Sequence, residues 1–166
     1  GASPDAVIVA PTDGHALLIG ADQTASATMI NSLIKYITFL TPSTSNPTYA
    51  ALTIAYMLKS VIEDCKFKGT TNTGFDPTPT TGLQIGNMTD TPWEFPEHCR
   101  VSRCEFTSNA GRTTELGRAI QVGGAICANP EYRGFKSMII EDCLMSAYDT
   151  AIHLQTGAAS CNGSVI

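Results

Sequence analysis

The segment Ser60-Val-Ile-Glu-Asp-Cys-Lys-Phe67 occurs in related form at three other places in this 166-residue chain. Two copies keep the cysteine: Arg100-Val-Ser-Arg-Cys-Glu-Phe106 and Ile139-Ile-Glu-Asp-Cys-Leu-Met145. A weaker copy, Leu33-Ile-Lys-Tyr-Ile-Thr-Phe39, has an isoleucine in place of the cysteine. The cysteines lie about 39 residues apart, and such a fixed interval predicts a protein built from stacked repeats.

Three positions are apolar in every copy when the copies are aligned on the cysteine. They hold Ile34, Ile62, Val101 and Ile140; then Ile37, Cys65, Cys104 and Cys143; then Phe39, Phe67, Phe106 and Met145. The last two positions are two residues apart, which is the spacing of side chains on one face of a strand. The first two are three residues apart, which predicts a bend after two outward residues. These outward pairs are polar except for Tyr36: Lys35/Tyr36, Glu63/Asp64, Ser102/Arg103 and Glu141/Asp142.

A second type of strand follows each copy of the repeat. It reads Leu52-Thr-Ile54, Leu83-Gln-Ile85, Ile120-Gln-Val122 and Ile152-His-Leu154, and an earlier member, Leu17-Leu-Ile19, precedes the first copy. Each member alternates between inward and outward residues over a short span, the pattern of a half-buried strand. No pattern in the sequence assigns a third side to the repeat.

Two alternating strand types, each matched in the next repeat, predict an all-β parallel solenoid in which like residues stack. Burying each stacked apolar side chain stabilises the fold by roughly 1.5–3 kcal/mol, and no coil can bury its inner face alone. A β-sandwich is the alternative, since it also has many short strands, but it does not require the same residue type in every repeat. Free cysteine packs as a small hydrophobe, so we expect the stacked cysteines to be reduced thiols.

The repeat resembles that of the right-handed parallel β-helix proteins of the pectate-lyase-like superfamily, which often reads hydrophobic-x-I-x-x-C-x-F and then G-h-x-h, with h hydrophobic. The opening, Gly1–Pro11 followed by Asp13-Gly-His-Ala-Leu-Leu-Ile-Gly20, is similar to the early coils of bacteriophage tailspike and tail-fibre proteins of this fold. The resemblance covers nearly the whole chain and implies a single-stranded right-handed parallel β-helix. Such proteins are typically homotrimers that bind, and often cleave, bacterial surface polysaccharide.

Length and composition limit the other possibilities. We expect one domain over residues 1–166, with further coils or domains outside this segment. Only 15% of residues are charged and the net charge is −5, which argues against nucleic acid as a partner. No apolar run has the length of a membrane span, so we expect no membrane insertion. We expect no cofactor, and Cys99 and Cys104 lack the second pair that a zinc site of this kind requires.

The outward acids supply the candidate catalytic residues, Glu63, Glu141 and Asp142. They occupy corresponding corners of two coils, with Ser102/Arg103 between them. Two strand spacings would separate such carboxylates by about 9–10 Å, which is compatible at best with inverting glycoside hydrolysis. The alternative is a solvated edge with a screened ion pair of little energetic value.

The candidate sugar-binding residues are Gln84, Gln121 and His153, which we expect to form an outward polar ladder, and Trp93. A polar ladder suits sugar hydroxyl groups, and it equally suits a subunit interface or plain hydrated surface. The aromatic face of Trp93 suits the apolar face of a sugar, although this residue could instead anchor its loop.

The favoured interpretation is a segment of a phage tailspike or receptor-binding tail fibre that attaches the virion to bacterial surface polysaccharide. The resemblance implies a homotrimer that contacts other tail or baseplate proteins and assembles in the bacterial cytoplasm into the virion. The first alternative is a polysaccharide depolymerase, a glycoside hydrolase or lyase that degrades capsule or O-antigen. The second is a cellular pectate-lyase-like enzyme, although that family's calcium-binding aspartates and catalytic arginine are not recognisable here.

Overall fold

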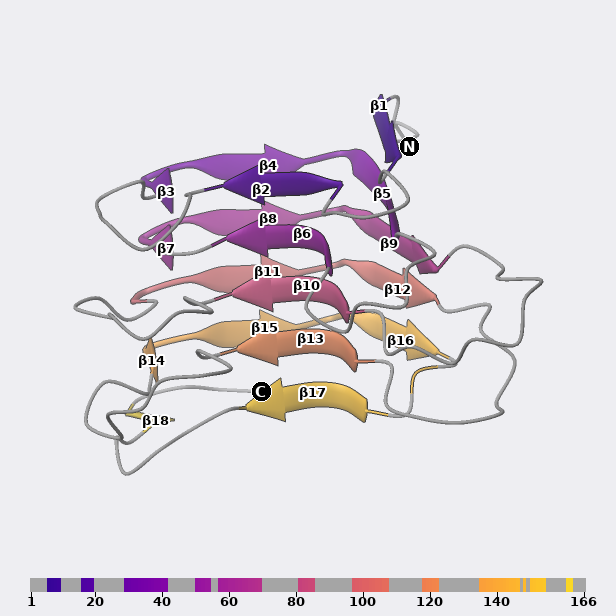
Figure 1. Ribbon diagram of the computed structural model, residues 1–166. Coiled ribbons are helices and arrows are strands. Elements are labelled where there is room, and N and C mark those ends of the chain that lie inside the picture. The colour runs from indigo at the N-terminus through magenta and orange to yellow at the C-terminus, as the bar shows by residue number, and fades with distance from the viewer. Residues whose placement is uncertain are drawn as a thin grey trace.

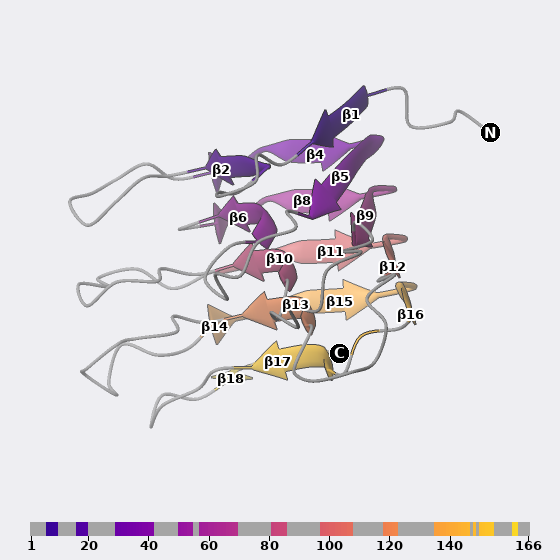
Figure 2. The same cartoon turned by 45° about the vertical axis from the view of Figure 1, so that its right-hand side comes forward.

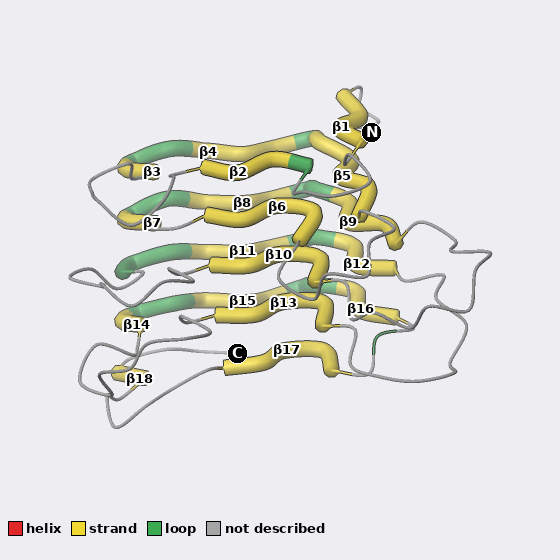
Figure 3. The backbone as a smooth tube through the Cα atoms, in the orientation of Figure 1, coloured by secondary structure: helices red, strands yellow, loops and turns green. Residues whose placement is uncertain are grey.

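The computed structural model describes strands and the turns between them, and no helix occurs in the described residues (Figure 3). These residues are 6–9, 16–19, 29–41, 50–54, 57–69, 81–85, 97–107, 118–122, 135–146, 148, 150–154 and 161–162. The strands stack in rows along one direction, as both ribbon views show (Figures 1 and 2). Every strand pairing in this part of the chain is parallel, which is consistent with the predicted solenoid and not with a β-sandwich.

Three sheets form the three main sides. The first sheet contains β1 (Ala6–Val9), β5 (Ile37–Thr41), β9 (Lys66–Gly69), β12 (Glu105–Thr107) and β16 (Leu144–Ser146). The second sheet contains β2 (Leu17–Ile19), β6 (Ala50–Ile54), β10 (Thr81–Ile85), β13 (Arg118–Val122) and β17 (Thr150–Leu154). The third sheet contains β4 (Leu33–Lys35), β8 (Val61–Glu63), β11 (Arg100–Ser102) and β15 (Ile139–Glu141). Two short pairs complete the fold: β3 (Met29–Ile30) with β7 (Met57–Leu58), and β14 (Phe135–Lys136) with β18 (Cys161–Asn162).

One coil is a pass through the third, first and second sheets in that order, followed by a short strand where one is present. The sequence pattern left one of the three sides unassigned. Each copy of the repeat supplies two sides, so the unassigned side lies within the copy. The predicted bend after the two outward residues divides each copy into a strand of the third sheet and a strand of the first sheet. The second strand type forms the second sheet, as predicted, with Leu83 paired to Leu52 and to Ile120.

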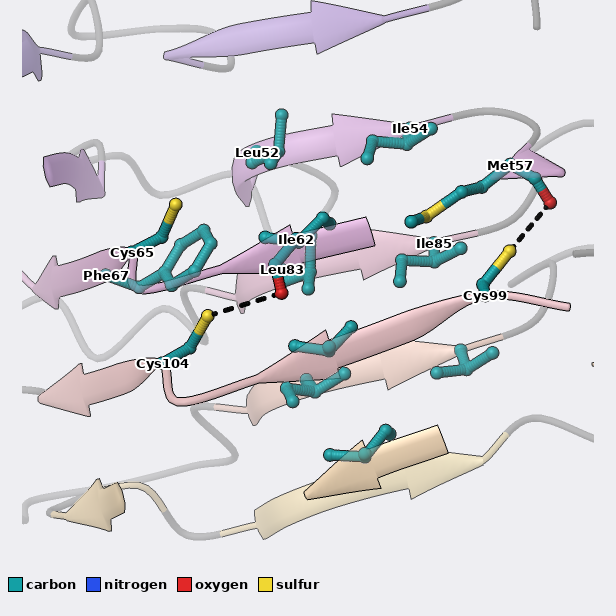
Figure 4. Close-up of a cluster of buried hydrophobic side chains, with 14 of the residues drawn as sticks. Leu52, Ile54, Met57, Ile62, Cys65, Phe67, Leu83, Ile85, Cys99 and Cys104 are labelled. Atoms are coloured by element: carbon teal, nitrogen blue, oxygen red, sulfur yellow. Dashed lines mark hydrogen bonds between the residues drawn. The ribbon is translucent and has the colours of Figure 1, made fainter. Parts of the chain in front are cut away.

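The stacked apolar columns are confirmed by the strand register. Ile62 pairs with Ile34 and Val101, and Phe67 pairs with Phe39 and Phe106. The three phenylalanines, which we call the aromatic column, are completely buried. Their rings stack with centroid distances of 5.1 Å for Phe39–Phe67 and 4.5 Å for Phe67–Phe106. Stacking of identical rings between coils thus forms the centre of the core, together with the aliphatic residues shown in Figure 4.

Left-handed backbone conformations make the bends of the coil. Eight non-glycine residues have φ between 47° and 59°, and they fall into two sets with one member in each of four coils. The first set lies between the third and first sheets and contains Tyr36, Asp64, Arg103 and Asp142; the second precedes the third sheet and contains Asn31, Lys59, His98 and Ser137. Asparagine and aspartate accept this conformation more readily than other non-glycine residues, which fits three of the eight positions.

The residue after each bend explains why cysteine recurs in the repeat. The Cys104 thiol lies 3.3 Å from the carbonyl oxygen of Ser102 and 3.8 Å from that of Ile62 in the preceding coil (Figure 4). Cys65 and Cys143 contact the equivalent pairs of carbonyl oxygens. A thiol is both a small hydrophobe and a weak donor, so it fills the corner and also satisfies carbonyl groups at the bend. We call Cys65, Cys104 and Cys143 the cysteine column.

The second set of bends uses the same arrangement, which the sequence pattern did not reveal. The Ser60 hydroxyl donates to the carbonyl oxygens of Leu58 and Met29, at 2.8 and 3.0 Å. In the next coil the Cys99 thiol contacts the carbonyl oxygens of Glu97 and Met57, at 3.1 and 3.0 Å (Figure 4). Cys65, Cys99, Cys104 and Cys143 are all free thiols, as expected for the cysteine column.

Gly82 in β10 occupies a position where no side chain fits. A Cβ atom there would lie 2.8 Å from the carbonyl oxygen of Ala119 and 3.0 Å from Cδ1 of Phe106. Because one neighbour is backbone, we expect Gly82→Ala to lower the free energy of unfolding by about 1–3 kcal/mol, the usual cost of overpacking. Urea denaturation of the variant would measure this loss, and an unchanged midpoint would contradict the close approach of β10 and β13.

Candidate functional site

The outward residues of the third sheet form one row across the coils. Glu63 pairs in register with Lys35 and with Ser102, and Ser102 pairs in turn with Glu141. The bend residues Asp64 and Arg103 follow Glu63 and Ser102 directly. The structure therefore places Glu63 and Glu141 in one row of the third sheet. The strands of this sheet, β4, β8, β11 and β15, lie side by side (Figures 1 and 2).

Lysine and arginine side chains hold these acids, and we call the group the corner ladder: Lys35, Glu63, Asp64, Arg100, Arg103 and Glu141. Lys35 Nζ lies 2.6 Å from Glu63 Oε1 and 3.3 Å from Asp64 Oδ2. Arg103 donates to Glu63 Oε2 at 2.6 Å and to both oxygens of Asp64 at 2.8 and 2.9 Å. Arg100 Nε donates to Glu141 Oε1 at 2.6 Å. The ladder therefore adds a side-chain link between each pair of adjacent coils in a set of four.

The cations of the ladder lower the pKa of two of its acids, Glu63 and Asp64. Lys35 and then Arg103 lower the pKa of Glu63, while Arg103 and then Lys35 lower that of Asp64. A general acid for glycoside hydrolysis needs the opposite, a raised pKa that keeps the proton near neutral pH. The lowered pKa favours the ionised form of Glu63 and also makes it a weaker base, so these contacts suit a structural role. Asp142, the third predicted acid, is exposed at a bend.

Ser102 corrects the prediction that all of the paired corner residues face solvent. Its side chain is completely buried, and its hydroxyl group has no hydrogen-bond partner within the described residues. Serine is short, so the guanidinium groups on either side of it can reach the acids of the neighbouring coils. Arg103 extends toward Glu63, and Arg100 extends toward Glu141. The position separates the two glutamates by about 9–10 Å, or two strand spacings.

The ladder predicts a loss of stability in acid. Glu63 and Asp64 have pKa values below their ordinary values of 4.5 and 3.8, so the unfolded chain binds more protons than the native one in this range. Their contribution is present above these values and is lost as the pH falls through the lowered native values. Arg103→Gln removes one cation, so we expect its thermal midpoint to fall less steeply than that of the native chain on acidification from about pH 5 to pH 3. Parallel slopes in a series of thermal melts would contradict this coupling.

The predicted sugar-binding ladder on the second sheet is only partly correct. Gln84 pairs with Gln121, and Gln121 pairs with His153, so the three residues do form one row. However, the side chains of Gln84 and Gln121 are only 2% and 3% exposed, so the prediction that they face solvent is wrong. Gln121 accepts a hydrogen bond of 2.6 Å from Arg118. His153 is half-buried, and burial, assisted by Arg118, lowers its pKa. Trp93 lies outside the described residues.

The described residues contain neither a metal-binding cluster nor a helix able to span a membrane. Cys99 and Cys104 serve two different bends and contact different carbonyl groups. No group of three or more histidine, cysteine, aspartate or glutamate side chains is arranged to hold a metal ion in the described ranges. Those ranges also contain no helix with the length and apolar character needed to cross a membrane.

The basic partners Lys35 and Arg100 are the ladder residues that sequence reasoning missed. One usable signal exists, because Lys35, Glu63 and Glu141 occupy the same place two residues before the cysteine position. The opposite charges of Lys35 and Glu63 at this position in adjacent coils predict their pairing, whereas Arg100 lies at another position and gives no such signal. Comparison of this chain with protein-family models, with curated proteins and with solved structures found no match.

Proposed function

We propose that this chain is a segment of a bacteriophage tailspike or receptor-binding tail fibre that attaches to bacterial surface polysaccharide. We also propose that its fold is a right-handed parallel β-helix of the pectate-lyase-like superfamily. The stacked parallel strands are compatible with that fold, and the repeat sequence resembles it. Assembly as a homotrimer in the virion, in contact with other tail or baseplate proteins, follows from this proposal.

The ion pairs of the acids in the corner ladder favour attachment over cleavage. Glu63 and Asp64 each contact two cations, and Glu141 contacts Arg100. These contacts join one coil to the next and keep Glu63 and Asp64 ionised, which supports a rigid shaft more than a proton-donating catalytic pair. A glycoside hydrolase that uses Glu63 and Glu141 would need one of them to stay protonated near neutral pH.

The proposal is tested by incubating the protein with a panel of purified capsule and O-antigen polysaccharides, then measuring retention and sizing the products. Retention without shortening is the expected result. Shortened oligosaccharides would establish the depolymerase instead, and Glu63→Gln, Glu141→Gln and Asp142→Asn would then test the three predicted acids. Sedimentation of the protein provides an independent check, since a trimer supports the phage assignment and a monomer contradicts it.

A further inference from the structure

Arg118 differs from the other two arginines in the described residues. Arg100 and Arg103 each bind an acid of the corner ladder. Arg118 instead donates from Nη1 to Oε1 of Gln121 at 2.6 Å, and it forms no ion pair within the part of the chain that the structure describes. A guanidinium group carries five N–H donors in a planar fork, so the contact with Gln121 uses only part of its donor capacity.

The guanidinium group of Arg118 lies on the outer face of the second sheet. Gln121 alternates along β13 with Ile120 and Val122, which are completely buried in the core, so its side chain points away from the core. Arg118 lies three residues earlier in the same strand, and its side chain reaches along this face to the Gln121 amide. That amide side chain is only 3% exposed, so a buried group fixes the position of the charge.

The strands beside β13 add polar groups to this face and no opposing charge. Gln84 in β10 and His153 in β17 both pair in register with Gln121. The five described strands of the second sheet contain no aspartate or glutamate. Because β13 has a paired strand on each side, the half-buried state of Arg118 does not arise from an end of the sheet. The centre of this face is therefore locally cationic on a chain whose net charge is −5.

We propose that Arg118, positioned by Gln121 and with His153 beside it, binds the carboxylate of an acidic sugar such as a uronic acid. This inference rests on the proposed attachment to polysaccharide and names the class of sugar that it involves. The planar fork of a guanidinium matches the two oxygens of a carboxylate, and such charge-assisted hydrogen bonds are about twice as strong as neutral ones. The imidazole of His153 adds a hydrogen-bonding group of the kind that sugar hydroxyls accept or donate to.

The site is tested by titrating the ¹⁵N-labelled protein with sodium glucuronate and following the backbone amide signals of β13 by NMR. We expect a saturable shift in the native chain and a Kd at least about tenfold higher in Arg118→Gln. Arg118→Lys keeps the charge without the fork, so its affinity should fall between the two. Arg100→Gln removes the same charge from the third sheet, and its Kd should stay within about twofold of the native value, since distant charges are screened.

Two further titrations, with glucose and with sodium acetate, determine what the site recognises. Glucose lacks the carboxylate and acetate lacks the sugar ring, so we expect both to bind more weakly than glucuronate. Equal shifts with glucose would show that the charge is not used. Equal shifts with acetate would show a general anion site. Either result, or the absence of any shift in β13 with glucuronate, would overturn the proposal.

Retention on the polysaccharide panel separates this proposal from the attachment function on which it rests. We expect acidic polysaccharides to be retained by the native chain and at least about tenfold less tightly by Arg118→Gln. Equal retention by the native chain and by folded Arg118→Gln would leave attachment standing and would overturn the site. Binding of glucuronate at β13 without retention on any polysaccharide would have the opposite meaning, since the carboxylate site would stand and attachment would fail.

Discussion

Replacing Cys104 with aspartate is expected to lower the free energy of unfolding by about 3–5 kcal/mol, the cost of an uncompensated buried charge. The side chain at this position is 2% exposed, and it faces the carbonyl oxygens of Ile62 and Ser102. A carboxylate would lose its hydration and would also meet two acceptors of like partial charge. Chemical denaturation measures the loss directly, provided that the variant folds well enough to be purified.

Glu141→Ala is the matched control for this prediction. Glu141 lies in the next coil, with its side chain 35% exposed, and it pairs with Arg100. Exposed ion pairs of this kind contribute about 0–1 kcal/mol, so the variant should remain close to the native stability. Equal tolerance of both substitutions would contradict the stacked column.

Phe67→Ala is the second substitution for which we expect a large effect, again about 3–5 kcal/mol. Phe67 is completely buried between two parallel rings, those of Phe39 and Phe106. Its removal leaves a cavity in the middle of the aromatic column and abolishes both ring contacts, each worth about 0.5–1.5 kcal/mol beyond the buried area. The expected signal is a lower denaturation midpoint together with weaker protection of β9 from hydrogen exchange.

Two further variants make the Phe67 result interpretable. Phe67→Leu keeps most of the volume and should lose less stability than the alanine variant. Leu144→Ala lies on the same sheet but its side chain is 62% exposed, so we expect a change within about 0.5 kcal/mol. If Phe67→Ala and Leu144→Ala behaved alike, the aromatic column would not be the core of the fold.

The sequence predicted the stacking because the repeat carries two kinds of spacing. The two-residue step between Cys65 and Phe67 predicts a strand face, and the three-residue step between Ile62 and Cys65 predicts a bend. Both steps depend only on local backbone geometry, so the register of the columns follows from them. The left-handed residue Asp64 lies where the three-residue step requires it.

The candidate sites were less predictable, because they depend on what lies over a sheet and on how far side chains reach. Alternation places Gln84 and Gln121 on the outer face of the second sheet, but it does not reveal that this face is covered. Similarly, the polar character of Ser102 and Arg103 suggests an exposed corner. Only the folded chain shows that Ser102 is completely buried, whereas the side chain of Arg103 is 47% exposed and extends to Glu63.

The connections from the first sheet to the second show what the in-register stacking makes possible. Between consecutive strands they comprise residues 42–49, 70–80, 108–117 and 147–149, so their length varies from eleven residues to three. The pairing of Leu52, Leu83, Ile120 and Ile152 is nevertheless uninterrupted. Because each coil is aligned by its neighbours, the length of these connections does not determine the position of the next strand. Foreign peptides inserted between β9 and β10, or between β12 and β13, should therefore leave the pairing of β6, β10, β13 and β17 unchanged.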